Sequence, residues 1–247
     1  MGILLLHGLG GDRTQVLQQL GPALPDHETV LAPDVRAHGA SPLIGQPHDF
    51  SLDALAAEIE NEAAAARLGP LTIVGVSMGA AIGLRIALRG RLQVERLVFV
   101  RPAFTNQPLP PNLAAFPVMG ELLHRHPAEK AETLFKGTGA YRRLHLESRL
   151  GAAGALEQFR APLAAERAIR LVEIPRNRVF DTPADLSELR MPSTVVAAPR
   201  DPVHPLSVAE LWHAALPAST LTVLPARDDG VPPYLAAMRA AVSNAFA

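Results

Sequence analysis

Residues 71–81 read LTIVGVSMGAA, an apolar run that passes through a serine between two glycines into small residues. This order predicts a buried strand, a sharp turn and a helix, with the Ser77 hydroxyl raised above the edge of a sheet. The glycines relieve the crowding that such a turn creates. Ser77 is therefore the candidate nucleophile. The backbone N–H of Met78, at the start of the predicted helix, is a candidate oxyanion donor.

A second glycine-rich segment, HGLGG at residues 7–11, follows an apolar run near the start of the chain. Glycines in this place allow the backbone to approach a ligand closely, and the N–H of Leu9 is a candidate for the second oxyanion donor. His7 stands at the end of a predicted strand, where an imidazole can hold a loop, and we assign it a structural role.

Short apolar runs alternate with longer segments of helical periodicity along most of the chain. The runs are apolar at successive positions, which is typical of parallel strands covered by helices on both faces. The order strand, helix, strand, helix predicts an α/β fold with a mostly parallel, doubly wound sheet of about six strands. The predicted strands are Ile3–Leu6, Thr29–Ala32, Leu71–Val74, Arg96–Val100, Thr194–Ala198 and Leu221–Leu224. The predicted helices are Thr14–Leu20, Leu52–Leu68, Met78–Leu88, Leu206–Leu216 and Pro233–Ala245.

One long stretch, residues 103–191, contains no convincing strand. It begins with several prolines and continues as amphipathic helical segments separated by glycine and proline. We interpret it as a helical cap, or lid, inserted into an α/β core made of residues 1–102 and 192–247, because ordinary crossovers seldom need so many residues. The alternative is a set of ordinary crossover helices.

Three motifs occur in order after successive predicted strands: HGLGG at 7–11, DVRAHGAS at 34–41 and GVSMG at 75–79. Together they resemble the α/β-hydrolase superfamily, in the branch of serine esterases and lipases with a helical cap. The resemblance covers nearly the whole chain. Because the first predicted strand begins at residue 3, two N-terminal strands usual in that family are expected to be missing, which leaves a more exposed sheet edge.

The resemblance implies a catalytic triad in the chain order serine, acid, histidine. Ser77 then stands as the nucleophile, and the N–H groups of Leu9 and Met78 form the oxyanion hole. Asp201 matches the position of the acid, in the loop PRDPVHP (residues 199–205) after the next-to-last predicted strand.

The sequence departs from the family's pattern at the histidine. After the last predicted strand the chain reads PARDDGVPP (residues 225–233), and no histidine follows His213. Asp229 occupies the place of the histidine by spacing, but an aspartate with an ordinary pKa near about 4 is a weak base toward a serine hydroxyl. His204, three residues after Asp201 in the same loop, is a candidate replacement for the base. The predicted cap carries further candidates, His124, His126 and His145.

The composition of the chain limits the kinds of partner that we expect. The 247-residue chain has a formal net charge of −1 with acidic and basic residues mixed along it, so it lacks the electrostatic footprint of a nucleic-acid-binding protein. It has no cysteine, which rules out disulfides and thiolate metal sites. No apolar run approaches the roughly 20 residues that span a bilayer, and the short apolar start lacks the basic region of a signal peptide. We expect a cytoplasmic monomer or homodimer that binds a small-molecule substrate, with no cofactor, no metal, no nucleic acid and no membrane partner.

Two functions from different classes fit these residues. The first is a serine hydrolase that acts on a carboxylic ester or thioester of a small or medium apolar acyl compound. The alternative is a non-hydrolytic or catalytically impaired descendant, either a ligand-binding pseudoenzyme or a cofactor-free enzyme, because the triad histidine is missing from its usual place. A third hypothesis is metal-dependent hydrolysis through Asp228, Asp229 and a nearby histidine. It lacks any H-x-H or H-E-x-x-H spacing in the sequence.

Overall fold

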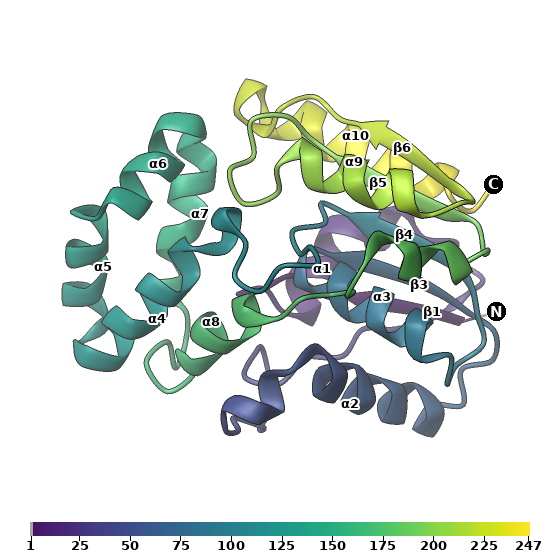
Figure 1. Ribbon diagram of the computed structural model, residues 1–247, viewed down its shortest axis with the longest axis horizontal. Helices are drawn as coiled ribbons and strands as arrows, with labels where there is room; N and C mark the ends of the chain where they lie inside the picture. The colour runs from purple at the N-terminus through teal and green to yellow at the C-terminus, as the bar shows by residue number, and fades with distance from the viewer. Residues whose placement is uncertain (1) are drawn as a thin grey trace.

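Within residues 2–247, which the computed structural model describes, six parallel strands form a single sheet (Figure 1). The strand order is β2-β1-β3-β4-β5-β6, and every neighbouring pair is parallel. The predicted parallel, doubly wound α/β fold with about six strands is confirmed. The strands are β1 (Gly2–Leu6), β2 (Thr29–Leu31), β3 (Leu71–Val76), β4 (Val94–Val100), β5 (Ser193–Ala197) and β6 (Ser219–Val223).

Helices cover both faces of the sheet, so the strands are buried on both sides. Leu4 and Leu6 of β1 pack in a core with helices α2 (Leu52–Ala65), α3 (Met78–Arg89) and α9 (Leu206–Ala215). Ile3 and Leu5 of the same strand pack in a second core with α1 (Arg13–Leu20) and α10 (Val231–Asn244). Because successive strand residues face opposite sides, both cores need apolar side chains, which explains the uninterrupted apolar runs of the sequence.

The ends of α2 show how local chemistry limits a helix. Its start is capped by Ser51, whose hydroxyl accepts a hydrogen bond from the backbone N–H of Ala54 at 3.2 Å. The periodicity predicts a helix to Leu68, but α2 ends at Ala65. Arg67 has a positive φ of 51°, which a right-handed helix does not tolerate, so the prediction was three residues too long.

Five helices lie between β4 and β5 and gather at one end of the sheet (Figure 1). They pack on one another around Phe135, which is fully buried and contacts the ring of Phe159 with a centroid distance of 5.4 Å. Arg167 donates to the carbonyl of Gly39 at 2.9 Å and so ties this helical segment to the loop after β2. The helices are α4 (Ala115–Arg125), α5 (Ala128–Lys136), α6 (Gly139–Glu147), α7 (Arg149–Arg160) and α8 (Ile169–Glu173).

Short 3-10 turns connect several of the elements. One of them, η6, follows β6 and contains Asp228 and Asp229. They are η1 (Gly21–Ala23), η2 (Pro47–Phe50), η3 (Pro111–Leu113), η4 (Ile174–Arg176), η5 (Pro183–Glu188) and η6 (Arg227–Asp229). No helix within residues 2–247 is both long and apolar enough to cross a membrane.

Candidate active site

Polar residues that line one cavity follow five of the six strands at the carboxyl edge of the sheet. His7 follows β1, Ser77 follows β3, Arg101 follows β4, Asp201 follows β5 and Arg227 follows β6. All five line one cavity with a volume of about 370 Å³, which α7 and α10 also border. Ligands of open parallel sheets bind at this edge, so the topology brings the chemistry of the chain to one place.

Ser77 occupies a strained turn between β3 and α3. Its backbone has a φ of 54° and a ψ of −109°, a conformation that costs a non-glycine residue about 1–3 kcal/mol. The turn is held because Ser77 donates its backbone N–H to the carbonyl of Val100 at 2.9 Å. Met78 is the first residue of α3, so its N–H has no acceptor within the helix and is available at the helix N-terminus.

The two glycines of the turn are required by close backbone contacts. A Cβ atom at Gly75 would lie 2.4 Å from the carbonyl oxygen of Gly79, and a Cβ atom at Gly79 would lie 2.3 Å from that of Leu6. Backbone atoms cannot move aside as a flexible side chain can. The glycines therefore let α3 press against the end of β1, which brings the loop containing Leu9 next to Ser77. Leu9 lines the same cavity.

His204 connects Ser77 to Asp201. The distance from His204 Nε2 to Ser77 Oγ is 2.8 Å, and the distance from His204 Nδ1 to Asp201 Oδ2 is 2.9 Å. An ionised carboxylate only accepts hydrogen bonds, so Nδ1 carries the proton and donates to Asp201. Nε2 is then free to accept the hydroxyl proton of Ser77, which is the geometry of a general base beside a nucleophile.

A local turn explains how His204 reaches this position from the loop of the acid. Asp201 Oδ1 accepts the backbone N–H groups of Val203 and His204, both at 3.1 Å. This aspartate turn folds the chain back within three residues, so the His204 side chain lies against the second oxygen of the same carboxylate. Asn112 holds the turn from outside by donating to the carbonyl of Val203 at 2.7 Å.

Burial and the neighbouring charges set the protonation of this pair. Burial lowers the pKa of His204 below its ordinary value of 6.5, and the charge of Asp201 opposes the shift only in part. Burial alone would raise the pKa of Asp201, but the charge and hydrogen bonds of His204, together with Arg101, outweigh it and hold that pKa well below its ordinary value. At neutral pH a neutral imidazole therefore faces an ionised carboxylate, the state in which His204 can take a proton.

Arg101 is a member of the site that the sequence reasoning missed. Its Nη1 lies 3.4 Å from Asp201 Oδ2, on the carboxylate oxygen that also binds His204. Its backbone has a φ of 53°, and its N–H donates to the carbonyl of Val196 at 2.7 Å. The available signal was its place: a charged residue directly after a buried strand, at the same sheet edge as Ser77.

The segment after β6 holds the residues that spacing assigned to the histidine's place. Asp229 forms an ion pair with Arg200, and its side chain is 61% exposed. Asp228 accepts hydrogen bonds from the Ser148 hydroxyl and, at 3.2 Å, from the backbone N–H of Leu150, so it ties this segment to α7. Neither carboxylate contacts Ser77. The histidines of the helical segment, His124, His126 and His145, do not line the cavity within the described residues.

His7 and His38 form a buried pair beside the cavity, with ring centroids 4.9 Å apart. Nε2 of His7 accepts the backbone N–H of Val35 at 3.1 Å, and Nδ1 of His38 lies 2.8 Å from the carbonyl of Arg36. These contacts join the loop after β1 to the loop after β2, which fits a structural role for both rings.

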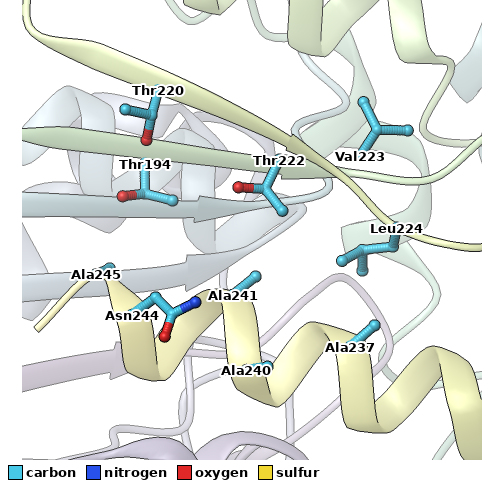
Figure 2. A pocket seen from close by; sticks show the side chains of 10 residues that line it. All are labelled: Thr194, Thr220, Thr222, Val223, Leu224, Ala237, Ala240, Ala241, Asn244 and Ala245. Atoms are coloured by element: carbon cyan, nitrogen blue, oxygen red, sulfur yellow. The ribbon is translucent and has the colours of Figure 1, made fainter. Parts of the chain in front are cut away.

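A second hollow lies away from these residues, between the strands β5 and β6 and the helix α10 (Figure 2). It has a volume of about 310 Å³ and is lined by threonines of the strands and alanines of the helix. None of its lining residues is an acid, a base or an activated nucleophile, so the chemistry belongs to the cavity at Ser77. Residues 2–247 contain no group of three or more His, Cys, Asp or Glu side chains able to hold a metal ion.

Known proteins resemble this chain in sequence. Residues 3–228 match the family model described as alpha/beta hydrolase fold. A protein of Agrobacterium fabrum named "Putative carbamate hydrolase RutD" is 31% identical over 228 residues, which cover 90% of this chain and 83% of that protein.

Solved structures share the fold. A hydrolase from Pseudomonas aeruginosa PA01 superposes with a TM-score of 0.73 at 22% identity, over 99% of this chain and 89% of that one. A thermophilic esterase from Thermogutta terrifontis superposes with a TM-score of 0.71 at 20% identity, over 100% of this chain and 91% of that one. At such identities the superpositions establish the common fold alone.

Proposed function

Because the chain belongs to the alpha/beta hydrolase fold family, we propose that it is a serine hydrolase in which Ser77 is the nucleophile, His204 the general base and Asp201 the acid that orients it. The observation that carries the proposal is the continuous hydrogen-bonded chain from Ser77 Oγ through the His204 ring to Asp201, with distances of 2.8 and 2.9 Å. The substrate class is a carboxylic ester or thioester. One relative is named for carbamates, so a carbamate belongs among the compounds to be tested.

The reaction follows from the positions of these atoms. His204 Nε2 takes the proton of Ser77 Oγ while the oxygen attacks the substrate carbonyl, and the oxyanion is bound by the backbone N–H groups of Leu9 and Met78. The protonated His204 then gives its proton to the leaving group, and the acyl group stays on Ser77. A water molecule, deprotonated by His204, attacks this acyl-enzyme, releases the acid and restores the serine hydroxyl.

The position of His204 argues against the catalytically impaired alternative. That alternative rested on the absence of a histidine after β6. Here the acid and the imidazole both belong to the loop after β5, and the aspartate turn of residues 201–204 supplies the geometry that two separate loops would otherwise supply. A triad built in this way needs no base in the segment after β6.

We further propose that residues 103–191 act as the cap of this site. Helix α7 contributes Gly151, Ala155 and Gln158 to the wall of the cavity. The contact of Asp228 with Ser148 fixes the beginning of α7 over the segment after β6. A substrate that reaches Ser77 therefore passes beside α7, and side chains of this helix would contribute to the preference for the acyl group.

Labelling with a fluorophosphonate probe, combined with a screen of p-nitrophenyl esters, tests the proposed nucleophile. The wild-type protein should be labelled at one serine and should hydrolyse at least one ester, and Ser77→Ala should lose both properties. Ser243→Ala is the matched control, because Ser243 is exposed near the end of α10 and does not line the cavity, and this variant should keep the label. Failure of wild-type Ser77 to react, together with no ester turnover, would overturn the proposal.

A further inference from the structure

The cavity at Ser77 contains charged side chains whose partners can be accounted for one by one. Its acidic residues are satisfied: Asp201 binds His204, and Glu157 pairs with Arg160 at 2.8 Å on the exposed rim. Arg200 pairs with Asp229. The cavity wall therefore offers no free carboxylate to a ligand.

Arg227 is different, because within residues 2–247 its guanidinium has no hydrogen bond and no ion pair. It lies in η6, lines the cavity and is partly buried. Neither neighbouring carboxylate forms an ion pair with it: Asp228 accepts hydrogen bonds from Ser148 and Leu150, and Asp229 pairs with Arg200. Arg227 and His204 line the same cavity. Burial is the main cause of the lowered pKa of His204, and the charges of Arg101 and Arg227 lower that pKa further.

Two buried polar atoms of the same cavity also have no hydrogen-bond partner in the part of the chain that the structure describes. These are Nε of Arg101 and the hydroxyl of Tyr234, each with almost no exposed surface. Both side chains line the cavity. A buried donor without an acceptor is costly, and both of these atoms can donate. The cavity thus holds two buried groups that can each donate a hydrogen bond to a ligand.

We propose that the cavity takes an acyl compound that carries a carboxylate, and that Arg227 binds this carboxylate and so determines specificity. The inference rests on the proposed serine hydrolase and names its substrate class as a monoester of a dicarboxylic acid. A guanidinium matches a carboxylate with two parallel hydrogen bonds, a pairing that a neutral acyl chain cannot provide. The unpaired donors of Arg101 and Tyr234 add to the affinity of the cavity for an acceptor.

Two esters of equal chain length test the proposal: mono-p-nitrophenyl glutarate, which carries a carboxylate, and p-nitrophenyl pentanoate, which does not. Wild-type protein should prefer the glutarate ester. Arg227→Gln should lower the ratio of kcat/KM for the glutarate ester to that for the pentanoate ester by about 10- to 100-fold, mainly through a higher KM. Arg227→Lys should restore part of the ratio, because it keeps the charge without the planar fork.

Arg190→Gln is the matched control, since Arg190 is an exposed arginine just before β5, at the opposite edge of the sheet from Ser77. It should leave the ratio unchanged. An equal loss for both esters in Arg227→Gln, or a wild-type preference for the pentanoate ester, would overturn the inference while leaving the hydrolase standing.

Binding of glutarate separates the inference from the proposed chemistry. Glutarate should raise the Tm of wild-type protein and of Ser77→Ala, in which hydrolysis is abolished, and should raise the Tm of Arg227→Gln much less. If no ester is hydrolysed but this pattern holds, the serine hydrolase fails and the carboxylate site stands. Equal shifts in all three proteins, or no shift in wild type, would overturn the site.

Discussion

The imidazole of His204 and the carboxylate of Asp201 belong to one four-residue turn, and that closeness sets what each residue does. Asp201 uses one oxygen to fold the backbone and the other to hold the imidazole. In the proposed mechanism the negative charge stabilises the imidazolium that forms when Ser77 gives up its proton, and the hydrogen bond fixes the tautomer. One side chain thus has an observed structural role and a proposed catalytic one.

Removing the charge of Asp201 should therefore be severe. Asp201→Asn can present its NH₂ group to His204 and favour the wrong tautomer, so we expect kcat to fall by about 10⁴-fold. Asp229→Asn is the control of equal charge change: Asp229 lies exposed against Arg200, and we expect kcat within about twofold of wild type. Ester hydrolysis under saturating substrate measures both. A large loss in Asp229→Asn instead would return Asp229 to the role of base.

At the scale of elements, the turn between β3 and α3 depends on how closely the helix approaches β1. Gly79→Ala places a Cβ atom 2.3 Å from the carbonyl oxygen of Leu6, so the backbone must shift. We expect the free energy of unfolding to fall by about 1–3 kcal/mol, as for other overpacked core sites. Urea unfolding gives the value. Gly69→Ala is the control, because a Cβ atom there meets nothing within 4 Å. A loss of similar size at Gly69 would contradict the steric explanation.

The strands and the serine turn could be predicted from sequence because they depend on local patterns. A run such as LTIVGVSMG carries both the burial of β3 and the glycines that the turn needs. The end of α2 could not be predicted as well, because the positive φ of Arg67 leaves no mark on the periodicity. Boundaries set by a single backbone angle are poorly encoded in composition.

The sequence predicted only those residues of the site that belong to local motifs. Ser77 and Asp201 follow from motifs, and the structure brings the two residues together through His204. His204 was a candidate on proximity in sequence, but its geometry depends on the aspartate turn and on Asn112, which reaches the turn from another segment. Arg101 and Arg227 belong to no sequence motif. Only the fold, which brings five strand ends together at one cavity, shows that these two residues lie in the site.

At the scale of the whole molecule, buried histidines couple stability to pH. Burial lowers the pKa of His7 and of His204. The pKa of His38 is lowered well below its ordinary value, mainly by burial and further by the charges of His7 and Arg170. In the unfolded chain these groups take up protons near pH 6.5, whereas in the folded protein they resist protonation. Stability should therefore fall as pH drops through about 6.5, by at most about 1.4 kcal/mol per pH unit for each histidine.

Urea unfolding at pH 7.5 and 5.5 measures this dependence. His38→Gln should reduce the difference between the two pH values, because one of the buried groups is removed. His48→Gln is the control, since the side chain of His48 is 82% exposed, and it should leave the difference as in wild type. A wild-type protein equally stable at both pH values would contradict the coupling.

The rate at which a fluorophosphonate labels Ser77 is the most direct measure of whether His204 activates it. In wild-type protein the base lies 2.8 Å from the hydroxyl, and we predict fast labelling of this one serine. In His204→Gln, with folding verified by circular dichroism, the second-order rate constant should fall by about 10³-fold or more, because a serine hydroxyl without a base is a weak nucleophile. A folded His204→Gln protein labelled at Ser77 as fast as wild type would contradict the assignment of His204 as the base.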